Sequence, residues 1–283
     1  MKLFKTAKGI LLQHFTGIYH LQTGWDILIN RKNLFEYLSQ QIPDSQRIAE
    51  DEFEKIIEHD LQAPVGSQEV WAAGVTYLRS RDARMEESKS AGGADFYQKV
   101  YEAERPELFF KALPQRVVGH GNGVYIRKDS SWNVPEPELT LYINSNGEIQ
   151  GYTIGNDMSS RSIEGENPLY LPQAKVYEKS AALGPCLYVP EQPISPETNI
   201  SIVIKRNEKE VFQGTIQLNR MKRSLIELAE YLYRECVFPS GCFLMTGTGI
   251  VPADDFTLQV NDEIDITIEK IGTLSNTVEY AEA

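Results

Sequence analysis

Hydrophobic and polar positions divide this chain into a short first part and a longer, strand-rich second part. In the first part, the pattern predicts one short strand and two short amphipathic helices, over residues 26–30, 34–38 and 52–58. Asp51 is available to cap the second of these helices. The stretch Ala-Pro-Val-Gly-Ser-Gln at residues 63–68 has the composition of a linker. We therefore expect a small N-terminal domain at residues 1–63 and a second, larger domain at residues 64–283.

The second part contains mainly apolar runs of strand length with few helical patterns. Strands are predicted at residues 70–75, 108–112, 139–143, 149–154, 200–205, 210–215, 242–246, 256–260 and 263–268. Helices are predicted at residues 77–91, 96–103 and 224–236, with the first two separated by the glycine-containing stretch 90–95. Residues 162–173 hold Gly and Pro with no clear period, so we expect an irregular loop of functional importance there. The pattern indicates a β-rich core with a few helices.

Composition limits the partners of the protein. The chain has 283 residues and a net charge of −12, which argues against binding to nucleic acid or to an anionic membrane surface. It lacks an apolar run of about eighteen residues and a signal-peptide pattern, so we expect no spanning helix and no secretion. An anionic substrate would need a local cation in order to bind.

The three cysteines, Cys186, Cys236 and Cys242, are odd in number and lack the spacing of a metal site. Free thiols in a reducing cytoplasm account for them most simply, and we expect them to behave as small buried hydrophobic residues.

Three carboxylates stand out on a predicted β-hairpin. Glu136 and Glu138 share one face of an extended segment, roughly 7 Å apart. The hairpin formed by residues 139–143 and 149–154 returns Asp157 to the same place. Three carboxylates that meet without a basic partner would repel, by about 4 kcal/mol per close pair at an effective dielectric constant of about 20. A hard divalent cation would remove this repulsion, whereas a solvated acidic face is the alternative.

Further motifs follow in a characteristic order. They are the Glu-x-Glu of Glu136 and Glu138, the Asn-Asp-x-Ser-x-Arg of residues 156–161, the Ala-Lys of residues 174–175 with Leu-Gly-Pro at 183–185, the Thr-Gly-Thr of 246–248, and the Ile-Gly-x-Leu-x-Asn of 271–276. Over residues 70–278 this set resembles the fumarylacetoacetate hydrolase superfamily. The resemblance implies an α+β fold with a mixed β-sandwich or β-roll catalytic domain, in dimers or larger oligomers. It also implies Mg²⁺, or Ca²⁺ or Mn²⁺, held by Glu136, Glu138 and Asp157.

One departure from the family pattern concerns the reaction. Hydrolases of the superfamily carry a Gly-x-Asn-Tyr-x-x-His segment, and here Ser80 stands where the histidine would be. The histidines of the chain, at positions 14, 20, 59 and 120, lie outside that segment. Serine without a partner cannot act as a base at neutral pH, which counts against hydrolysis. With residues 101–112, the segment resembles the sugar-acid dehydratases of the superfamily instead.

This resemblance implies metal-dependent dehydration of a 2-keto-3-deoxy sugar acid, with 2-keto-3-deoxy-D-arabinonate as substrate and 2-oxoglutarate semialdehyde (2,5-dioxopentanoate) as product. It suggests Lys175 and Glu107 as the acid/base residues, although Lys175 could instead form a structural ion pair with Glu138 and Glu107 could be a strand-edge charge. Candidate substrate contacts are Arg79, Ser80, Arg81, Arg161, Gln173, Thr248 and Thr273. The alternatives are hydrolysis of acylpyruvates or 2,4-diketo acids, oxaloacetate decarboxylation, and a non-catalytic sugar-acid binder. A cytoplasmic homodimer or homotetramer is expected.

Overall fold

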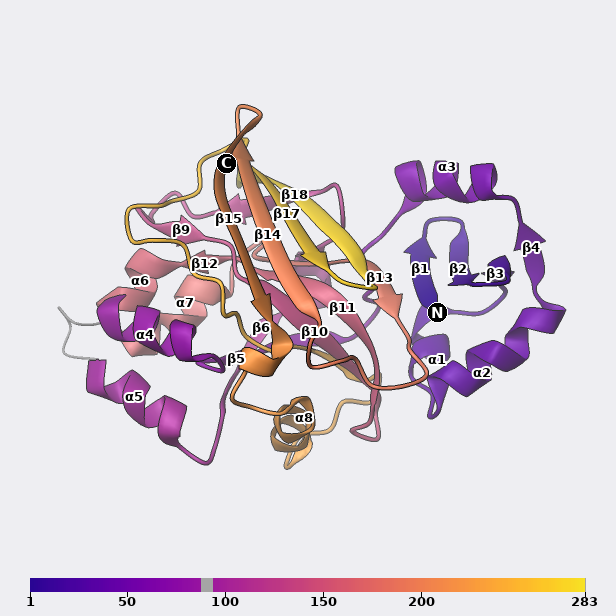
Figure 1. Ribbon diagram of the computed structural model, residues 1–283, viewed down its shortest axis with the longest axis horizontal. Coiled ribbons are helices and arrows are strands. Elements are labelled where there is room, and N and C mark those ends of the chain that lie inside the picture. Colours follow the sequence, from indigo (N-terminus) through magenta and orange to yellow (C-terminus); the bar gives the residue numbers. More distant parts are fainter. Residues whose placement is uncertain (88–93, 283) are drawn as a thin grey trace.

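The computed structural model describes residues 1–87 and 94–282, and its strands form two main sheets within these ranges (Figure 1). The larger sheet contains β1 (Lys2–Thr6), β2 (Gly9–His14), β3 (Gly17–Leu21), β4 (Gln46–Ile48), β5 (Glu69–Gly74), β6 (Glu107–Ala112), β7 (Val117–Val118), β10 (Pro137–Ile143), β11 (Ile149–Asp157), β13 (Ala181–Tyr188) and β16 (Cys242–Met245). The second sheet contains β8 (Gly123–Ile126), β14 (Asn199–Arg206), β15 (Lys209–Gln217), β17 (Glu263–Ile268) and β18 (Gly272–Tyr280). A short pair is formed by β9 (Asn133–Val134) and β12 (Ser159–Ser160).

Helices lie around these sheets. They are α1 (Trp25–Ile29), α2 (Leu34–Gln41), α3 (Glu50–Asp60), α4 (Leu78–Glu87), α5 (Ala94–Glu102), α6 (Arg161–Glu166), α7 (Leu171–Lys175) and α8 (Leu225–Tyr233). Single 3₁₀ turns occur at Ile42–Asp44, Pro114–Arg116, Pro168–Tyr170 and Leu218–Arg220. Within the described ranges, no helix is long and apolar enough to cross a membrane.

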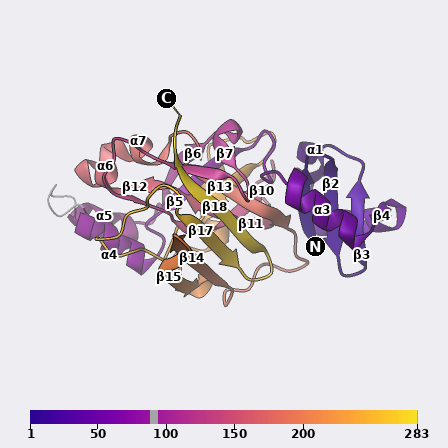
Figure 2. The ribbon, with the colours of Figure 1, turned by 90° about the horizontal axis from the view of Figure 1, so that it is seen from above.

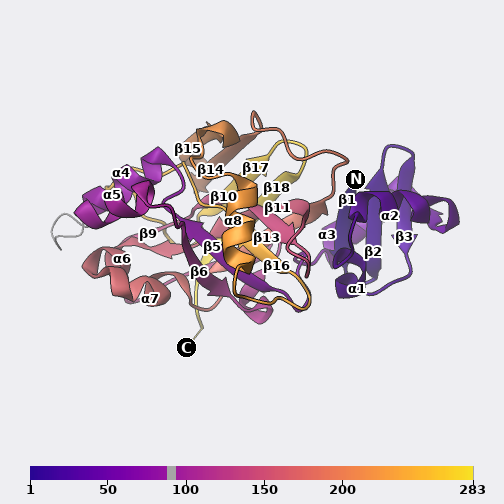
Figure 3. The same ribbon diagram turned by 90° about the horizontal axis from the view of Figure 1, so that it is seen from below.

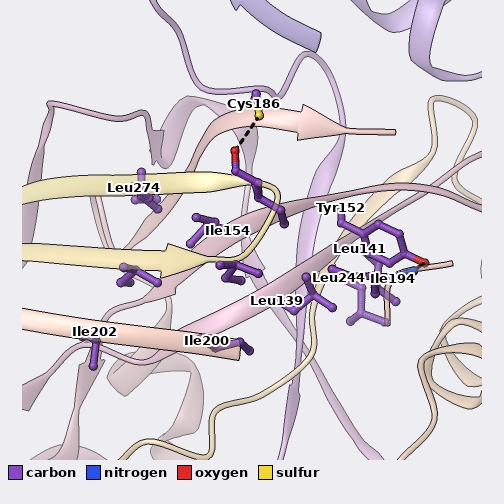
Figure 4. Close-up of a cluster of buried hydrophobic side chains, with 14 of the residues drawn as sticks. Leu139, Leu141, Tyr152, Ile154, Cys186, Ile194, Ile200, Ile202, Leu244 and Leu274 are labelled. Carbon is purple, nitrogen blue, oxygen red and sulfur yellow. Dashed lines mark hydrogen bonds between the residues drawn. The ribbon is translucent and has the colours of Figure 1, made fainter. Parts of the chain in front are cut away.

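The two sheets pack face to face around one apolar core (Figure 4). Alternate residues of β14, Ile200, Ile202 and Ile204, are buried, as a strand with one face toward a core requires. They meet Leu139 and Leu141 of β10, a strand that is buried along its whole length. The architecture is a mixed β-sandwich with helices, which confirms the α+β fold class expected from the sequence.

The N-terminal segment extends the larger sheet and forms a lobe at one end of the molecule (Figures 1 and 2). The link is the antiparallel pairing of β1 with β13, in which Leu3 lies opposite Leu187. The sequence pattern missed strands β1–β3. It also predicted a strand at residues 26–30, where α1 stands; Trp25, Leu28 and Ile29 are buried at helical spacing, and an apolar run this short cannot distinguish the two structures. The domain boundary at residue 63 stays a prediction.

Helices α2 and α3 confirm the two predicted helices, but Asp51 does not cap α3. The N-cap position is Ala49. Asp51 lies in the first turn, where its negative charge interacts favourably with the positive end of the helix dipole.

Most strands and helices of the second part lie where the sequence predicts them, including the hairpins β10–β11 and β14–β15. Helix α8 is seen in front of the sheet when the molecule is viewed from below (Figure 3), and Leu228 and Leu232 of this helix pack into the core. A capping box of Ser224 and Glu227 begins it. The predicted break at residues 90–95 lies largely outside the described residues.

The sequence did not predict the long strands β13 and β18, and two further segments differ from the prediction. Residues 162–173 are not irregular: they contain α6, a 3₁₀ turn and the start of α7, each too short to show a period. Ser160 and Asn167 begin the first two by accepting backbone N–H bonds. Residues 256–260 form no strand: the Leu258 N–H donates to the Asn133 carbonyl of β9, but the Thr257 carbonyl accepts from the Arg206 side chain.

All three cysteines are free thiols, and Cys186 and Cys242 are buried as expected. Cys236 is exposed, so the prediction of a buried hydrophobic role was wrong for this residue. It follows α8 in a surface loop, where nothing covers its side chain.

Candidate active site

The β10–β11 hairpin brings Glu136, Glu138 and Asp157 together. Pro137 pairs with Asn156 across the two strands, and the Asp157 N–H donates to the Glu136 carbonyl oxygen at 3.0 Å. One carboxylate oxygen from each of the three residues lies within 4.8 Å of the others, and all three side chains are buried. This geometry rules out a solvated acidic face, because the carboxylates point inward.

Three cations surround the carboxylates. The Lys175 Nζ lies 2.6 Å from Glu136 Oε2 and 3.1 Å from Asp157 Oδ2. Arg161 Nη2 lies 2.6 Å from Glu136 Oε1, and Lys111 Nζ lies 2.6 Å from Asp157 Oδ1. The expectation of a cluster without a basic partner was therefore wrong, because residues distant in sequence supply the charges. Lys175 makes its close ion pairs with Glu136 and Asp157, where the sequence-based alternative had Glu138.

The ionised form of Glu138 is disfavoured in the metal-free fold. Burial raises its pKa, and the nearby Asp157 and Glu136 raise it further. Lys175 and the Gly247 N–H, which donates to Glu138 Oε2 at 2.6 Å, act in the opposite direction. A divalent cation beside Glu138 would favour its ionised form.

Gly247 can donate this bond only because it is a glycine. Its φ of +90° is a conformation that L side chains rarely adopt, and a Cβ atom would lie 2.1 Å from Thr76 Oγ1. The Thr-Gly-Thr motif thus supplies a backbone donor to a carboxylate.

A narrow cavity opens onto the cluster. Its lining residues are Ala73, Gly74, Val75, Ser80, Phe109, Glu136, Glu138, Asp157, Arg161, Lys175, Gly247 and Thr248. Four of the residues that the sequence suggested for catalysis or substrate binding are among them: Ser80, Arg161, Lys175 and Thr248. The Ser80 hydroxyl donates to the Tyr77 carbonyl at 2.8 Å and accepts from the Tyr77 N–H at 3.2 Å, so it closes the turn that begins α4.

Glu107 lies at the edge of this cavity. It pairs with Gly74 across β5 and β6, and a Cβ atom on Gly74 would lie 2.1 Å from Glu107 Oε2. Gly74 lines the cavity, and because it has no side chain, the Glu107 carboxylate has room to pack against it.

Four other candidates do not line the cavity. Arg79 lines a separate hollow with Tyr101 and Arg220. Gln173 is exposed on α7, and the Thr273 hydroxyl bonds to the Thr267 hydroxyl at 2.8 Å on an exposed face of β17 and β18. Arg81 pairs with Asp82.

The sequence-based interpretation missed Lys111, although a signal was present. A lysine in the middle of the apolar run Leu108–Ala112 must either end the strand or meet a buried acid, since an unpaired buried charge is costly. It also missed Ser159, whose Oγ accepts from Lys175 Nζ at 2.5 Å. This residue is the serine of the Asn-Asp-x-Ser-x-Arg motif, but the motif alone does not show its contact with Lys175.

Comparisons with known proteins place the chain in a family. The family model described as fumarylacetoacetate (FAA) hydrolase C-terminal matches residues 70–279. This match covers well over half of the chain, so the protein belongs to the fumarylacetoacetate hydrolase family, as its motifs predicted.

Two relatives and one solved structure are similar over most of their length. A probable 2-keto-3-deoxyxylonate dehydratase of Haloferax volcanii is 46% identical over 242 residues, covering 85% of this chain and 81% of that protein. A 2-dehydro-3-deoxy-D-arabinonate dehydratase of Saccharolobus solfataricus is 44% identical over 216 residues, covering 76% and 72%. A structure of 2-keto-3-deoxy-D-arabinonate dehydratase complexed with magnesium and 2,5-dioxopentanoate matches with a TM-score of 0.84 and 33% identity, covering 100% of both chains.

Proposed function

We propose that this protein is a magnesium-dependent dehydratase that converts 2-keto-3-deoxy-D-arabinonate into 2,5-dioxopentanoate. The observation that carries the proposal is the buried triad of Glu136, Glu138 and Asp157, in a chain that matches the magnesium-containing dehydratase complex along its whole length. The resemblance seen in the motifs leads to the same reaction.

The xylonate and arabinonate names of the two relatives are compatible with one substrate. Xylonate and arabinonate of the same series differ only at C2 and C3. A 2-keto-3-deoxy derivative has lost both of those stereocentres, so the two sugar acids yield the same compound. We therefore propose one substrate, whichever pentose supplies it.

The donor set fits a hard divalent cation. Glu136, Glu138 and Asp157 offer carboxylate oxygens within 4.8 Å of one another, and such oxygens are the ligands preferred by Mg²⁺ and also suit Ca²⁺ and Mn²⁺. When bound, Mg²⁺ would supply positive charge that binds the anionic keto acid and withdraws electrons from its C2 carbonyl. Arg161 holds Glu136 at 2.6 Å, so we assign it to the orientation of this ligand.

Lys175 and Glu107 carry the proton transfers in our proposal. Lys175 enters the cavity from the end of α7 and, in its neutral amine form, takes a proton from C3 of the substrate. Glu107, at the cavity edge, gives a proton to the departing C4 hydroxyl. One water leaves and a C3–C4 double bond forms. Proton transfers from C5 to C3, and from the resulting enol to C4, then yield the aldehyde.

Phe109 forms an apolar wall beside these groups. The centre of its ring lies 5.9 Å from Lys175 Nζ, and the residue lines the cavity. An aromatic wall keeps bulk water from the proton donor and acceptor, which favours loss of water over its addition. Ser80 and Thr248 line the same cavity and are candidates for contacts with the substrate hydroxyls.

Removing the metal is expected to abolish dehydration. We expect protein treated with a chelator to lose turnover of 2-keto-3-deoxy-D-arabinonate, and added Mg²⁺ to restore it, because the keto acid then regains its cation. Steady-state rates with and without Mg²⁺ measure this. Full activity of metal-free protein would contradict it.

The same assay distinguishes the alternatives from the proposed reaction. An acylpyruvate and oxaloacetate serve as competing substrates, which report hydrolysis and decarboxylation. We expect the keto sugar acid to give the highest kcat/KM, because the Ser80 hydroxyl, bonded to the Tyr77 backbone, replaces the expected histidine base. Binding of the sugar acid without turnover would indicate the non-catalytic binder.

Oligomeric state and location stay predictions. We propose a homodimer or homotetramer, as the family resemblance implies, and a cytoplasmic location, which the free thiols support.

A further inference from the structure

Lys111 lies beneath the carboxylate cluster, and the reaction proposed above gives it no part. Its side chain is fully buried. Its Nζ forms an ion pair with Asp157 Oδ1 at 2.6 Å and donates hydrogen bonds to the Met158 carbonyl at 3.0 Å and to the Lys175 carbonyl at 2.5 Å. The ammonium charge is thus paired with a carboxylate, and two of its hydrogens have backbone acceptors. One side chain thus joins the end of β11 to the end of α7.

The course of β6 explains this position. Alternation along β6 places Glu107 and Phe109 on the same side, and Lys111 stands at a register shift between β5 and β6, from which its Nζ reaches the Met158 and Lys175 carbonyls. Glu107 is packed against Gly74 at the cavity edge, and Phe109 lines the cavity. Lys111 is the deepest of the three and is not part of the lining. It therefore acts through other residues, without touching the substrate.

We propose that Lys111 is a positioning residue that sets the geometry between the metal ligand Asp157 and the base Lys175. Its ion pair with Oδ1 limits the rotation of the Asp157 carboxylate and leaves Oδ2 facing the cluster, 3.1 Å from Lys175 Nζ. Its bond to the Lys175 carbonyl fixes the backbone from which the base projects. The inference rests on the metal site of the proposed function.

A positioning role and a purely electrostatic role of Lys111 predict opposite effects of its removal on the affinity for Mg²⁺. If Lys111 contributed only its positive charge, removing it would reduce repulsion toward an incoming cation, and the metal would bind more tightly. If Lys111 orients Asp157, its removal frees the carboxylate to rotate, and the metal binds more weakly. Loss of a group that orients a ligand typically costs about 10- to 100-fold in metal affinity.

The experiment compares Lys111→Met with Lys111→Gln. Methionine removes charge and donor, whereas glutamine removes the charge and keeps an N–H donor. Calorimetric titration of chelator-treated protein with Mg²⁺ is expected to give about 10- to 100-fold weaker binding for Lys111→Met and a smaller loss for Lys111→Gln. Lys5→Met is the matched control: the Lys5 Nζ donates to the Val65 carbonyl at 2.5 Å in another part of the fold, so its loss should leave Mg²⁺ affinity unchanged.

Each outcome decides the question. A folded Lys111→Met variant that binds Mg²⁺ as tightly as wild type, or more tightly, overturns the positioning role. If this variant does not fold, as judged by circular dichroism, Lys111→Gln is decisive: weaker binding supports the role, and equal or tighter binding overturns it. Wild-type protein that binds Mg²⁺ without dehydrating the keto acid overturns the proposed function and leaves this test intact. A wild-type chain that binds no divalent cation overturns both.

Discussion

Replacing Lys175 with methionine is expected to lower kcat for dehydration by about 10²- to 10⁴-fold, the usual contribution of a positioned acid or base. Methionine keeps the length and apolar stem of lysine but cannot take the C3 proton. Mg²⁺ binding should persist, because Lys175 Nζ competes with a cation for oxygens of Glu136 and Asp157, at 2.6 and 3.1 Å. Steady-state kinetics and Mg²⁺ titration on the same preparation measure both effects.

An exposed lysine provides the control for this substitution. Lys8 pairs with Asp60 on the surface of the N-terminal lobe, so Lys8→Met should retain wild-type kcat. A Lys175→Met enzyme whose kcat lies within threefold of wild type would show that another group removes the proton. Loss of Mg²⁺ binding in this variant would assign Lys175 to the metal site rather than to proton transfer.

Glu138→Gln is expected to abolish metal binding and to stabilise the metal-free protein. Burial and neighbouring carboxylates raise the pKa of Glu138 in the folded state above its value in the unfolded chain. Its ionisation therefore destabilises the metal-free fold as pH rises through the folded-state pKa, and the penalty is absent below the unfolded-state pKa, where the group is neutral in both states. Glutamine is neutral throughout and can still accept from the Gly247 N–H.

Thermal melts with and without Mg²⁺ test both parts of this prediction. At a concentration of 100 times its Kd, a ligand stabilises a folded protein by about 2.7 kcal/mol, so wild type should melt at a higher temperature with Mg²⁺. Glu138→Gln should melt above metal-free wild type at neutral pH and show no response to Mg²⁺. Glu164→Gln is the matched control, because Glu164 is also buried but lies outside the carboxylate triad, and it should keep the response. A Glu138→Gln variant that responds to Mg²⁺ like wild type would remove Glu138 from the site.

The sequence predicted the triad because every step was local. Strand alternation places Glu136 and Glu138 on one face, and a tight hairpin brings Asp157 next to them. The pairing of β10 with β11 is therefore enough to assemble the triad. The ordered motifs then indicated the family, which the comparisons confirmed.

The pairing of the cations with these carboxylates could not be predicted from the sequence, because it depends on tertiary packing. Lys111 stands on β6 and Arg161 at the start of α6, and only their packing on the hairpin brings them to its carboxylates. The same limit explains Thr273. Its motif matches the family, but its hydroxyl meets Thr267 on the exposed face of the second sheet, and a motif match does not determine where a side chain points.

The N-terminal lobe was predicted least well. Strands β1–β3 are short and derive their stability from pairing with one another and with β13, so their identity depends on a partner nearly 190 residues away in the sequence. The α1 helix was read as a strand because five residues are too few to establish a period.

The dehydratase activity is tested most directly by proton NMR of the complete reaction of the purified protein with 2-keto-3-deoxy-D-arabinonate in the presence of Mg²⁺. We expect a single five-carbon product, 2,5-dioxopentanoate, with its aldehyde signal appearing as the substrate signals disappear. An unchanged substrate, together with pyruvate released from an acylpyruvate or a 2,4-diketo acid under the same conditions, would contradict it.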